Sequence, residues 1–321
     1  MPQVSVCVPS YNHSKFIKEL IESVLSQTFT DFELIICDDA STDSSVEIIK
    51  SFNDRRIRFY QNEKNLGIVE TMNRCISLAQ GEFINIIGSD DAMLPNNLLK
   101  KVEFLKAHPY AGIVYSDIDK IDEGGQLIGH IWGNQSKTDT ILDKTTAFKR
   151  LIQEGNFLCH SAALLRKQCH DQVGIYDERF RSNQDYDMWL RISLHYDVGY
   201  MVEPLIKYRW HQNNITRDYV GEHRLKGKDK DYLARKAALE QYHQFAQGKI
   251  FTDNELAQIY CEFGQFSYWT DDLRTARGFF LKALKHNSFS IKIFIYIILS
   301  LFPVGMIHFL RHLKNILKRE K

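Results

Sequence analysis

The first 115 residues alternate between short apolar runs, typical of buried strands, and longer stretches with apolar residues at helical spacing. The runs cover residues 4–8, 32–37, 57–60, 83–87 and 112–115. Strands that alternate with helices of this length build a parallel sheet through right-handed crossovers. The periodicity weakens after residue 117, where we expect loops and strands that make the sheet mixed. The sequence therefore predicts an α/β fold with a mixed, mainly parallel sheet flanked by helices.

Polar residues follow three of these runs, at the points where the strands are expected to end. They are Pro9, Ser10 and Tyr11 after the first run, Asp38 and Asp39 after the second, and Asp90 and Asp91 after the fourth. The carboxyl ends of parallel strands meet at one edge of the sheet, which is where open α/β sheets bind ligands. Each group alone could be a capping turn or loop. Together they predict one polar cleft.

Asp90 and Asp91 come directly after a turn formed by Gly88 and Ser89. Two adjacent carboxylates repel each other unless a cation or hydrogen-bond donors offset their charge. A hard divalent ion that holds a diphosphate would supply that offset. The alternative for this pair taken alone is a solvated loop that caps the next helix.

Two later residues have both a structural and a functional interpretation. Asp185 lies at the entry of a predicted helix, where an acid ordinarily caps the helix and favours its dipole. If it faces the cleft, it would instead be a general base for an incoming hydroxyl. His211 follows Arg209 and Trp210 after a strand-like segment, and it would either be structural or contact a pyrophosphate or its metal.

The composition is that of an ordinary globular protein and gives no bulk electrostatic reason to bind nucleic acid. Hydrophobic residues make up 44% and charged residues 25% of the 321 residues, and the formal net charge is +1. The six cysteines are scattered without a C-x-x-C pair, as expected of reduced core thiols in a cytosolic protein. Met1 leads directly into the strand-like VSVCV, so we expect no signal peptide and a cytoplasmic location.

A family resemblance is carried by the stretches VSVCVPSYN, IICDDASTD, FINIIGSDDAMLP and NQDYDMW. In this order and at this spacing they resemble the nucleotide-sugar-dependent glycosyltransferases of family two, which have the Rossmann-like GT-A fold. The resemblance covers roughly residues 1–215. It implies inverting transfer from a nucleotide sugar, with a UDP-sugar as the expected donor and Mn²⁺ or Mg²⁺ as the expected cofactor.

Carried over residue by residue, the resemblance implies a nucleotide site, a metal site and a catalytic base. The implied nucleotide-binding residues are Pro9, Ser10, Tyr11, Asn12, Asp38, Asp39, Ser89 and Asp90. Asp90 would be a metal ligand with Asp91 beside it, and we expect His211 to join them. Asp185 keeps the position of the base, which takes the proton of the acceptor hydroxyl. Two positions depart from the family pattern, since Gly88 and Gln184 stand where acids are common.

The C-terminal third has a different composition, and we expect a catalytic domain over residues 1–216 and a helical region over residues 217–321. Gly264, Ala276, Phe280 and Ala283 have the spacing of a single tetratricopeptide-like hairpin. Residues 291–310 are strongly apolar but too interrupted to span a bilayer, and a basic tail follows them. This predicts an in-plane, monotopic contact with the inner leaflet of a membrane, and a buried helix is the alternative.

The expected function is transfer of a hexosyl or N-acetylhexosaminyl group to a glycan or lipid-linked acceptor in bacterial surface polysaccharide synthesis. One alternative is a glycosyltransferase-like scaffold subunit with impaired catalysis, which Gly88 and Gln184 leave open. The other is a sugar nucleotidyltransferase. That class would need a Gly-rich phosphate loop with Lys or Arg after the first strand, and PSYNHSK lacks it.

Overall fold

A computed structural model describes residues 1–131, 137–180, 183–212, 214, 234–239, 250–286 and 291–302. The chain divides into two compact units, Met1–Glu240 and Gln241–Lys321. The boundary expected after residue 216 falls outside the described residues, as do most of the charged stretch before residue 250 and the basic tail.

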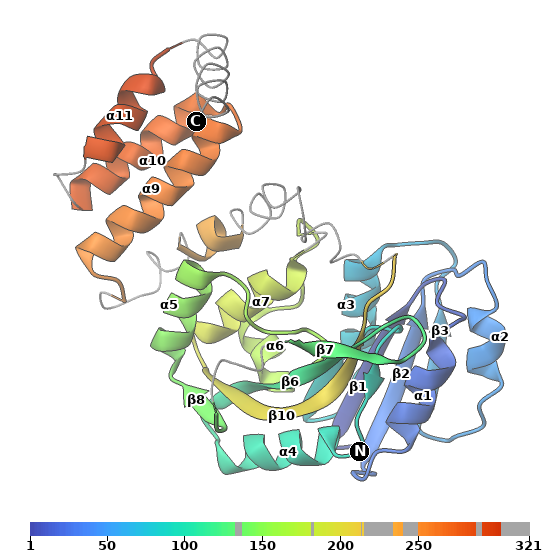
Figure 1. The fold of residues 1–321 in the computed structure, drawn as a ribbon. Helices are drawn as coiled ribbons and strands as arrows, with labels where there is room; N and C mark the ends of the chain where they lie inside the picture. The colour runs from blue at the N-terminus through green and yellow to red at the C-terminus, as the bar shows by residue number, and fades with distance from the viewer. Residues whose placement is uncertain are drawn as a thin grey trace. The chain divides into compact units, whose positions relative to one another are not determined.

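The first unit contains a ten-stranded mixed sheet with the order β3-β2-β1-β4-β9-β6-β10-β5, with β7 paired to β6 and β8 to β10 (Figure 1). The first four strands are β1 (Val4–Ser10), β2 (Phe32–Asp38), β3 (Ile57–Gln61) and β4 (Phe83–Ile86). The later strands are β5 (Ala92–Met93), β6 (Ala111–Ile121), β7 (Leu127–Ile131), β8 (Thr140–Leu142), β9 (Ala163–Arg166) and β10 (Asp197–Arg209). The predicted strands and the mixed sheet are confirmed.

Helices cover both faces of this sheet (Figure 1). One core lies between the sheet and the helices α1 (Ile17–Leu25), α2 (Ser45–Lys50) and α4 (Asn97–Ala107). Further helices of this unit include α3 (Ile68–Leu78), α5 (Lys144–Glu154), α6 (Lys167–Val173) and α7 (Gln184–Ser193). Every residue of β1 and β2 is buried. A strand that is covered on both faces has a continuous run of apolar residues, so β1 and β2 can be predicted from the sequence alone.

The strand β9 joins the two halves of the sheet. It pairs antiparallel with β4 on one side and with β6 on the other, whereas β1, β2, β3 and β4 pair in parallel. Asn85, in β4, donates from Nδ2 to the carbonyl oxygens of Ser161 (3.2 Å) and Ala163 (2.6 Å). The residues that lead into β9 therefore cross the carboxyl end of β4.

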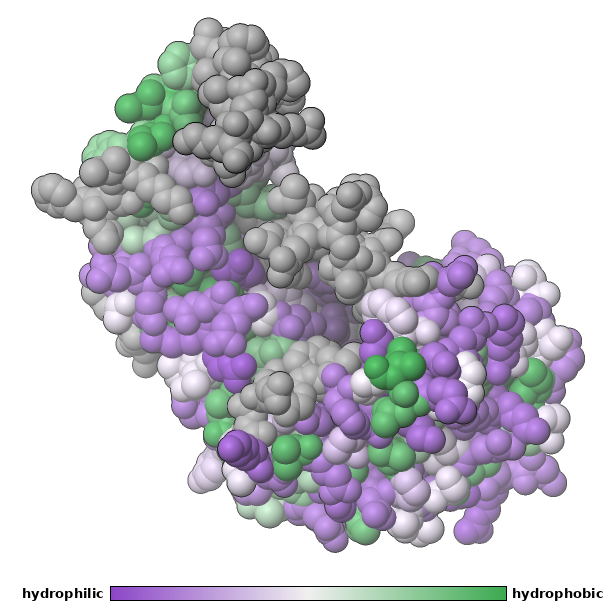
Figure 2. All heavy atoms as spheres, in the orientation of Figure 1, coloured by the Kyte–Doolittle hydropathy of each residue, from purple (hydrophilic) through white to green (hydrophobic). Residues whose placement is uncertain are grey.

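The second unit contains α9 (Asp253–Trp269), α10 (Leu273–His286) and α11 (Ile291–Leu299). Thr252 and Glu255 form a capping box at the start of α9. A Cβ on Gly264 would lie 2.5 Å from Cε1 of Phe280, so glycine is needed where α9 and α10 pack. Apolar side chains gather on the surface around α11 (Figure 2). Within the described part of the chain, no helix has the length and apolar character to cross a membrane.

A lysine lies inside the core of the first unit. Lys101, on α4, is fully buried and donates from Nζ to Oδ1 of Asn97. Burial lowers the pKa of Lys101 to about 7. The unfolded chain therefore binds a proton that the folded protein releases above this pH. The free energy of unfolding should therefore rise with pH between about 7 and 10.5. Below about pH 7 the buried lysine lowers the stability of the fold by its full amount.

We expect Lys101→Met to raise the free energy of unfolding by roughly 3 kcal/mol at pH 7, because it removes the cost of burying this group. The gain should shrink towards pH 10, where the unfolded lysine also begins to lose its proton. Urea unfolding at both pH values measures the effect, with Lys106→Met, at an exposed position of the same helix, as the control. A Lys101→Met protein that is no more stable than the wild type at pH 7 would contradict this account.

Candidate active site

The loops that follow β1 and β2 are bound to each other at the carboxyl edge of the sheet. Asn12 donates from its backbone nitrogen to Oγ of Ser41 (2.9 Å), and its Oδ1 accepts from the backbone nitrogen of Thr42 (2.8 Å). Asn12 has a φ of 54°, a left-handed conformation that asparagine tolerates. Pro9 and Ser10 are buried, whereas Tyr11 is exposed. The residues expected around a nucleobase therefore lie at the end of β1 and on the loop that follows it, which is bound to the loop after β2.

Asp38 and Asp39 are buried, and their carboxylates accept hydrogen bonds from two loops, the one after β2 and the one between β3 and α3. Asp38 accepts from the backbone nitrogen (2.9 Å) and Oγ (2.5 Å) of Ser41. Asp39 accepts from Nδ2 of Asn62 (2.7 Å) and from the backbone nitrogens of Leu66 and Gly67 (2.8 Å each). Both acids thus hold the loop conformations at this edge of the sheet.

Three potential metal ligands meet beside these loops. His13, Asp90 and His211 each offer a ligand atom, and these atoms lie within 4.8 Å of one another. Nε2 of His211 lies 2.9 Å from Oδ2 of Asp90, and Nδ1 of His13 lies 2.6 Å from Oγ of Ser89. Two imidazoles and one carboxylate suit a divalent transition ion such as Mn²⁺ better than Mg²⁺, which prefers oxygen ligands.

The protonation of this group suits cation binding. Burial alone would raise the pKa of Asp90, but the hydrogen bond to His211 and the nearby His13 outweigh it and hold the pKa below its ordinary value. Burial lowers the pKa of His13, and Asp90 only partly opposes this. A charged carboxylate beside a neutral imidazole is the state that a metal ion requires of its ligands.

Asp91, predicted beside Asp90 at the metal, faces other partners. Its Oδ2 accepts from Oγ of Ser161 (2.5 Å), and its Oδ1 accepts from the backbone nitrogen of Arg209 (3.0 Å). Burial, and then the neighbouring Asp90, raise the pKa of Asp91. Asp91 lies outside the three-residue group that the described residues form, because both of its oxygens already hold segments of the fold.

Gly88 gives the two acids room. A Cβ at this position would lie 2.7 Å from Oδ1 of Asp90 and 3.2 Å from Oδ2 of Asp91. An acidic side chain here would therefore require the Asp90 carboxylate to move. Glycine in place of the common acid is compatible with the observed arrangement of the cluster.

The buried side chain of Arg209 holds in place the backbone around the group of His13, Asp90 and His211. Its side chain is 1% exposed and donates from Nε to the carbonyl oxygen of Asp90 (2.8 Å). It also pairs with Glu19 and donates to the carbonyl oxygens of Asp122 and Glu123 (3.2 Å each). Since His211 lies two residues further on, Arg209 fixes the backbone on both sides of the His211–Asp90 contact.

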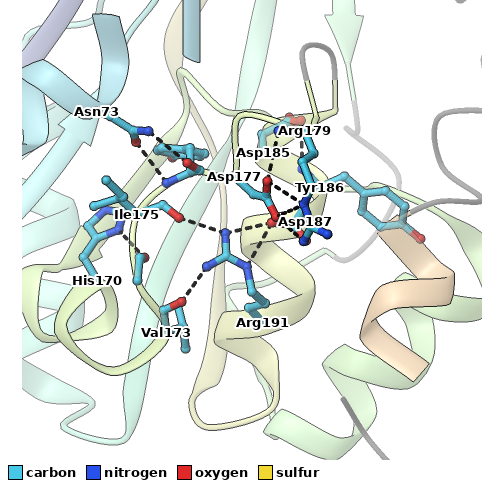
Figure 3. Close-up of polar contacts among 12 residues, drawn as sticks. Asn73, His170, Val173, Ile175, Asp177, Arg179, Asp185, Tyr186, Asp187 and Arg191 are labelled. Carbon is cyan, nitrogen blue, oxygen red and sulfur yellow. Dashed lines mark hydrogen bonds and ion pairs between the residues drawn. The ribbon is translucent and has the colours of Figure 1, made fainter. Parts of the chain in front are cut away.

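Asp185 lies in the first turn of α7, where the chain enters the helix through Asn183 at a φ of 73° (Figure 3). Its Oδ1 accepts from the backbone nitrogen of Tyr186 (2.8 Å), and its Oδ2 accepts from Nδ2 of Asn156 (3.1 Å). Burial raises the pKa of Asp185, although both hydrogen bonds oppose the shift. A carboxylate with a raised pKa is a stronger base at neutral pH, which suits proton abstraction.

The loop before α7 is bound on two sides (Figure 3). Arg191, paired with Asp187, donates to the carbonyl oxygens of Val173 (2.6 Å) and Ile175 (3.1 Å). Asn73, on α3, exchanges two hydrogen bonds with the backbone of Tyr176, at 2.9 and 3.0 Å. The start of α7 is thus fixed relative to the half of the sheet that carries the nucleotide-site candidates.

Sequence reasoning missed three residues of this site: His13, Asn156 and Ser161. His13 had a usable signal, because it comes directly after Tyr11 and Asn12 at the same sheet edge. Asn156 and Ser161 had none, since their roles depend on the antiparallel placement of β9 between β4 and β6.

Comparison with known proteins places the chain in a family. Residues 5–174, more than half of the chain, match the family described as glycosyl transferase family 2. The chain is 32% identical over 213 residues to an uncharacterized glycosyltransferase of Methanocaldococcus jannaschii, which covers 65% of this chain and 71% of the relative. It is 33% identical over 214 residues to the putative glycosyltransferase EpsE of Bacillus subtilis, covering 65% and 73%. It is 32% identical over 197 residues to chondroitin synthase of Escherichia coli, covering 60% and 27%.

A solved structure shares the fold. The crystal structure of residues 1–349 of S. aureus TarS in complex with UDP-GlcNAc superimposes with a TM-score of 0.59 over 89% of both chains, at 17% identity. At this identity the likeness shows the GT-A fold alone. With the family match over residues 5–174 and the glycosyltransferase relatives, it establishes that this chain belongs to glycosyl transferase family 2 and is a glycosyltransferase with the GT-A fold.

Proposed function

We propose that this enzyme is a metal-dependent, inverting glycosyltransferase that transfers a sugar from a UDP-sugar to a hydroxyl group of a glycan or lipid-linked acceptor. The observation that carries the proposal is the group of His13, Asp90 and His211 at the carboxyl edge of the sheet. The complex of TarS with UDP-GlcNAc supports a UDP-linked donor. The similarity to chondroitin synthase supports a role in polysaccharide synthesis, and we propose surface polysaccharide as the product.

His13, Asp90 and His211 would hold the divalent ion. Asp91 would stabilise the site through its hydrogen bonds to Ser161 and Arg209. When bound, the ion supplies positive charge that stabilises the departing nucleoside diphosphate. The linked loops that carry Tyr11 and Asn12 would bind the nucleoside, with Ser10, Asp38 and Asp39 setting their shape. Ser89 would orient the imidazole of His13 through the 2.6 Å contact.

Asp185 would be the general base. The acceptor oxygen forms a bond to the anomeric carbon on the face opposite the diphosphate, the bond to the diphosphate oxygen breaks, and the acceptor proton passes to Asp185. One displacement of this kind inverts the configuration and needs no covalent intermediate. The raised pKa of Asp185 and its partial burial support the assignment.

We expect calorimetric titration with UDP, GDP, CDP and dTDP to show binding of UDP that requires Mn²⁺ and is lost in EDTA. Asp90→Ala and His13→Ala should each weaken this binding at least about tenfold, because each removes a ligand or its orientation. Asp171→Ala, which changes an exposed acid on α6, is the control. Equal binding in EDTA would refute the metal site. Absence of binding to every nucleotide would favour the scaffold alternative.

Asp185→Asn should lower kcat by about 10²- to 10⁴-fold and leave the Kd for UDP unchanged, because it removes the proton acceptor and keeps the shape of the side chain. Transfer of radiolabelled sugar measures turnover, and the calorimetric assay measures nucleotide binding. Glu178→Gln, at an exposed position before α7, serves as the control. Normal turnover in Asp185→Asn would show that another group is the base.

We also propose that the C-terminal unit contacts the cytoplasmic face of an anionic membrane in the plane of the bilayer. Exposed apolar side chains lie on α11 and just beyond it: Phe294, Ile295, Ile298, Leu301 and Phe302. In the sequence they are followed by a basic tail that includes Arg311, Lys314, Lys318, Arg319 and Lys321, which lies outside the described residues. Apolar side chains followed by basic ones suit a surface of anionic lipid.

The double substitution Phe294→Glu and Ile298→Glu should abolish sedimentation of the protein with phosphatidylserine-containing vesicles, because it places charge on the apolar face of α11. Leu281→Glu, at an exposed apolar position of α10, should leave sedimentation unchanged. Wild-type protein should bind vesicles of pure phosphatidylcholine more weakly, since these lack negative charge. Unchanged sedimentation of the double variant would overturn the membrane proposal.

A further inference from the structure

One short segment contacts both parts of the candidate active site. Residues 156–161 lie between α5 and β9, and we call them the connecting segment. At one end, Nδ2 of Asn156 donates to Oδ2 of Asp185 (3.1 Å). At the other end, Oγ of Ser161 donates to Oδ2 of Asp91 (2.5 Å) and accepts from the backbone nitrogen of Gly88 (3.1 Å). The connecting segment therefore links the proposed base to the turn that carries the paired acids.

The amide of Asn156 has a defined orientation. Its Oδ1 accepts from the backbone nitrogen of Leu158 (3.1 Å), so the NH₂ group is the side that faces Asp185. The other oxygen of Asp185 is held by the backbone nitrogen of Tyr186 (2.8 Å). With a donor on each oxygen, rotation of the Asp185 carboxylate about its Cβ–Cγ bond is restricted.

The connecting segment is itself anchored along its length. Its apolar residues Phe157, Leu158 and Cys159 are buried. Nε2 of His160 lies 2.8 Å from the hydroxyl of Tyr176, whose backbone is bound by Asn73. Asn156 thus belongs to a segment that is anchored by buried apolar side chains and by the contact of His160 with Tyr176, and a residue that orients a catalytic group needs such support.

We propose that Asn156 is a positioning residue for the transfer reaction, holding the Asp185 carboxylate in the orientation that accepts the proton of the acceptor hydroxyl. The inference rests on the proposed function of Asp185 as the base. Because the same segment ends at the Asp91 turn, it also fixes the base relative to Asp90 and the donor diphosphate. A displacement of about 1 Å in such a geometry can cost about 10²-fold in rate.

The hydrogen bond from Asn156 should be visible in the titration of Asp185. Burial raises the pKa of Asp185, and the donors Tyr186 N and Asn156 Nδ2 oppose that rise. The titratable neighbours that face it are Cys159 and Tyr176, and burial raises the pKa of both, which keeps them uncharged where Asp185 titrates. On α7 itself, Asp187 is paired with Arg191. Removing Asn156 should therefore raise the pKa of Asp185 further.

Asn156→Ala and Asn156→Asp test the proposal in the full chain, with Glu154→Gln as the control, since Glu154 makes an exposed pair with Arg150 at the end of α5. Carboxyl ¹³C NMR follows the Asp185 resonance with pH, assigned by its absence in Asp185→Asn. We expect an upward pKa shift in Asn156→Ala, a larger one in Asn156→Asp because of the added negative charge, and none in Glu154→Gln. Transfer assays should show kcat lowered about 10- to 100-fold with the Kd for UDP unchanged.

An unchanged Asp185 pKa in both Asn156 variants would overturn the proposal, as would normal kcat in Asn156→Ala. A loss of UDP binding together with kcat would also overturn it, because that would indicate general damage to the fold. If the wild-type enzyme transfers no sugar, the proposed function fails. The NMR titration still decides whether Asn156 orients Asp185, so the two failures are distinguishable.

Discussion

The buried carboxylate of Asp91 is the interaction on which the rest of the site depends. It is 2% exposed, and its two oxygens accept from Ser161 Oγ and from the backbone nitrogen of Arg209. A buried carboxyl group without hydrogen-bond partners destabilises a fold, so the hydroxyl of Ser161 and the backbone nitrogen of Arg209 have to be in place to satisfy it. The turn after β4, the connecting segment before β9 and the end of β10 are thereby joined at one point.

The two adjacent acids divide two tasks that one acid could not perform. Asp91 accepts hydrogen bonds from Ser161 and Arg209 and so joins segments of the chain. Asp90 contacts His211 beside His13. Their pKa values are shifted in opposite directions: burial and the Asp90 charge raise that of Asp91, whereas His211 and His13 hold that of Asp90 low. This separation favours the carboxylate form at Asp90, where a cation would bind, and it reduces the repulsion between the neighbours.

The parts of this arrangement that could be predicted from the sequence are those that depend on local pattern. Continuous apolar runs mark β1, β2 and β4 because helices cover both faces of the sheet, and the polar residues after them identify the binding edge. The direction in which each carboxylate faces depends on partners far along the chain. Asp91 bonds to Ser161, 70 residues on, and to Arg209, 118 residues on. No periodicity near Asp91 encodes those contacts.

The family match ends at residue 174, yet Asp185 and His211 lie beyond it. Their position in the same unit has a physical cause. The strand β10 pairs in parallel with β6 and antiparallel with β5, and it ends with Arg209, whose guanidinium binds the carbonyl oxygen of Asp90. The helix α7 is fixed through Arg191 to the loop that Asn73 binds from α3. The loop and strand that bring Asp185 and His211 to the site are thus bonded to α3 and to the turn that carries Asp90. A substitution in the segments that carry Asp185 and His211 would therefore alter the geometry both at the proposed base and at the group around Asp90.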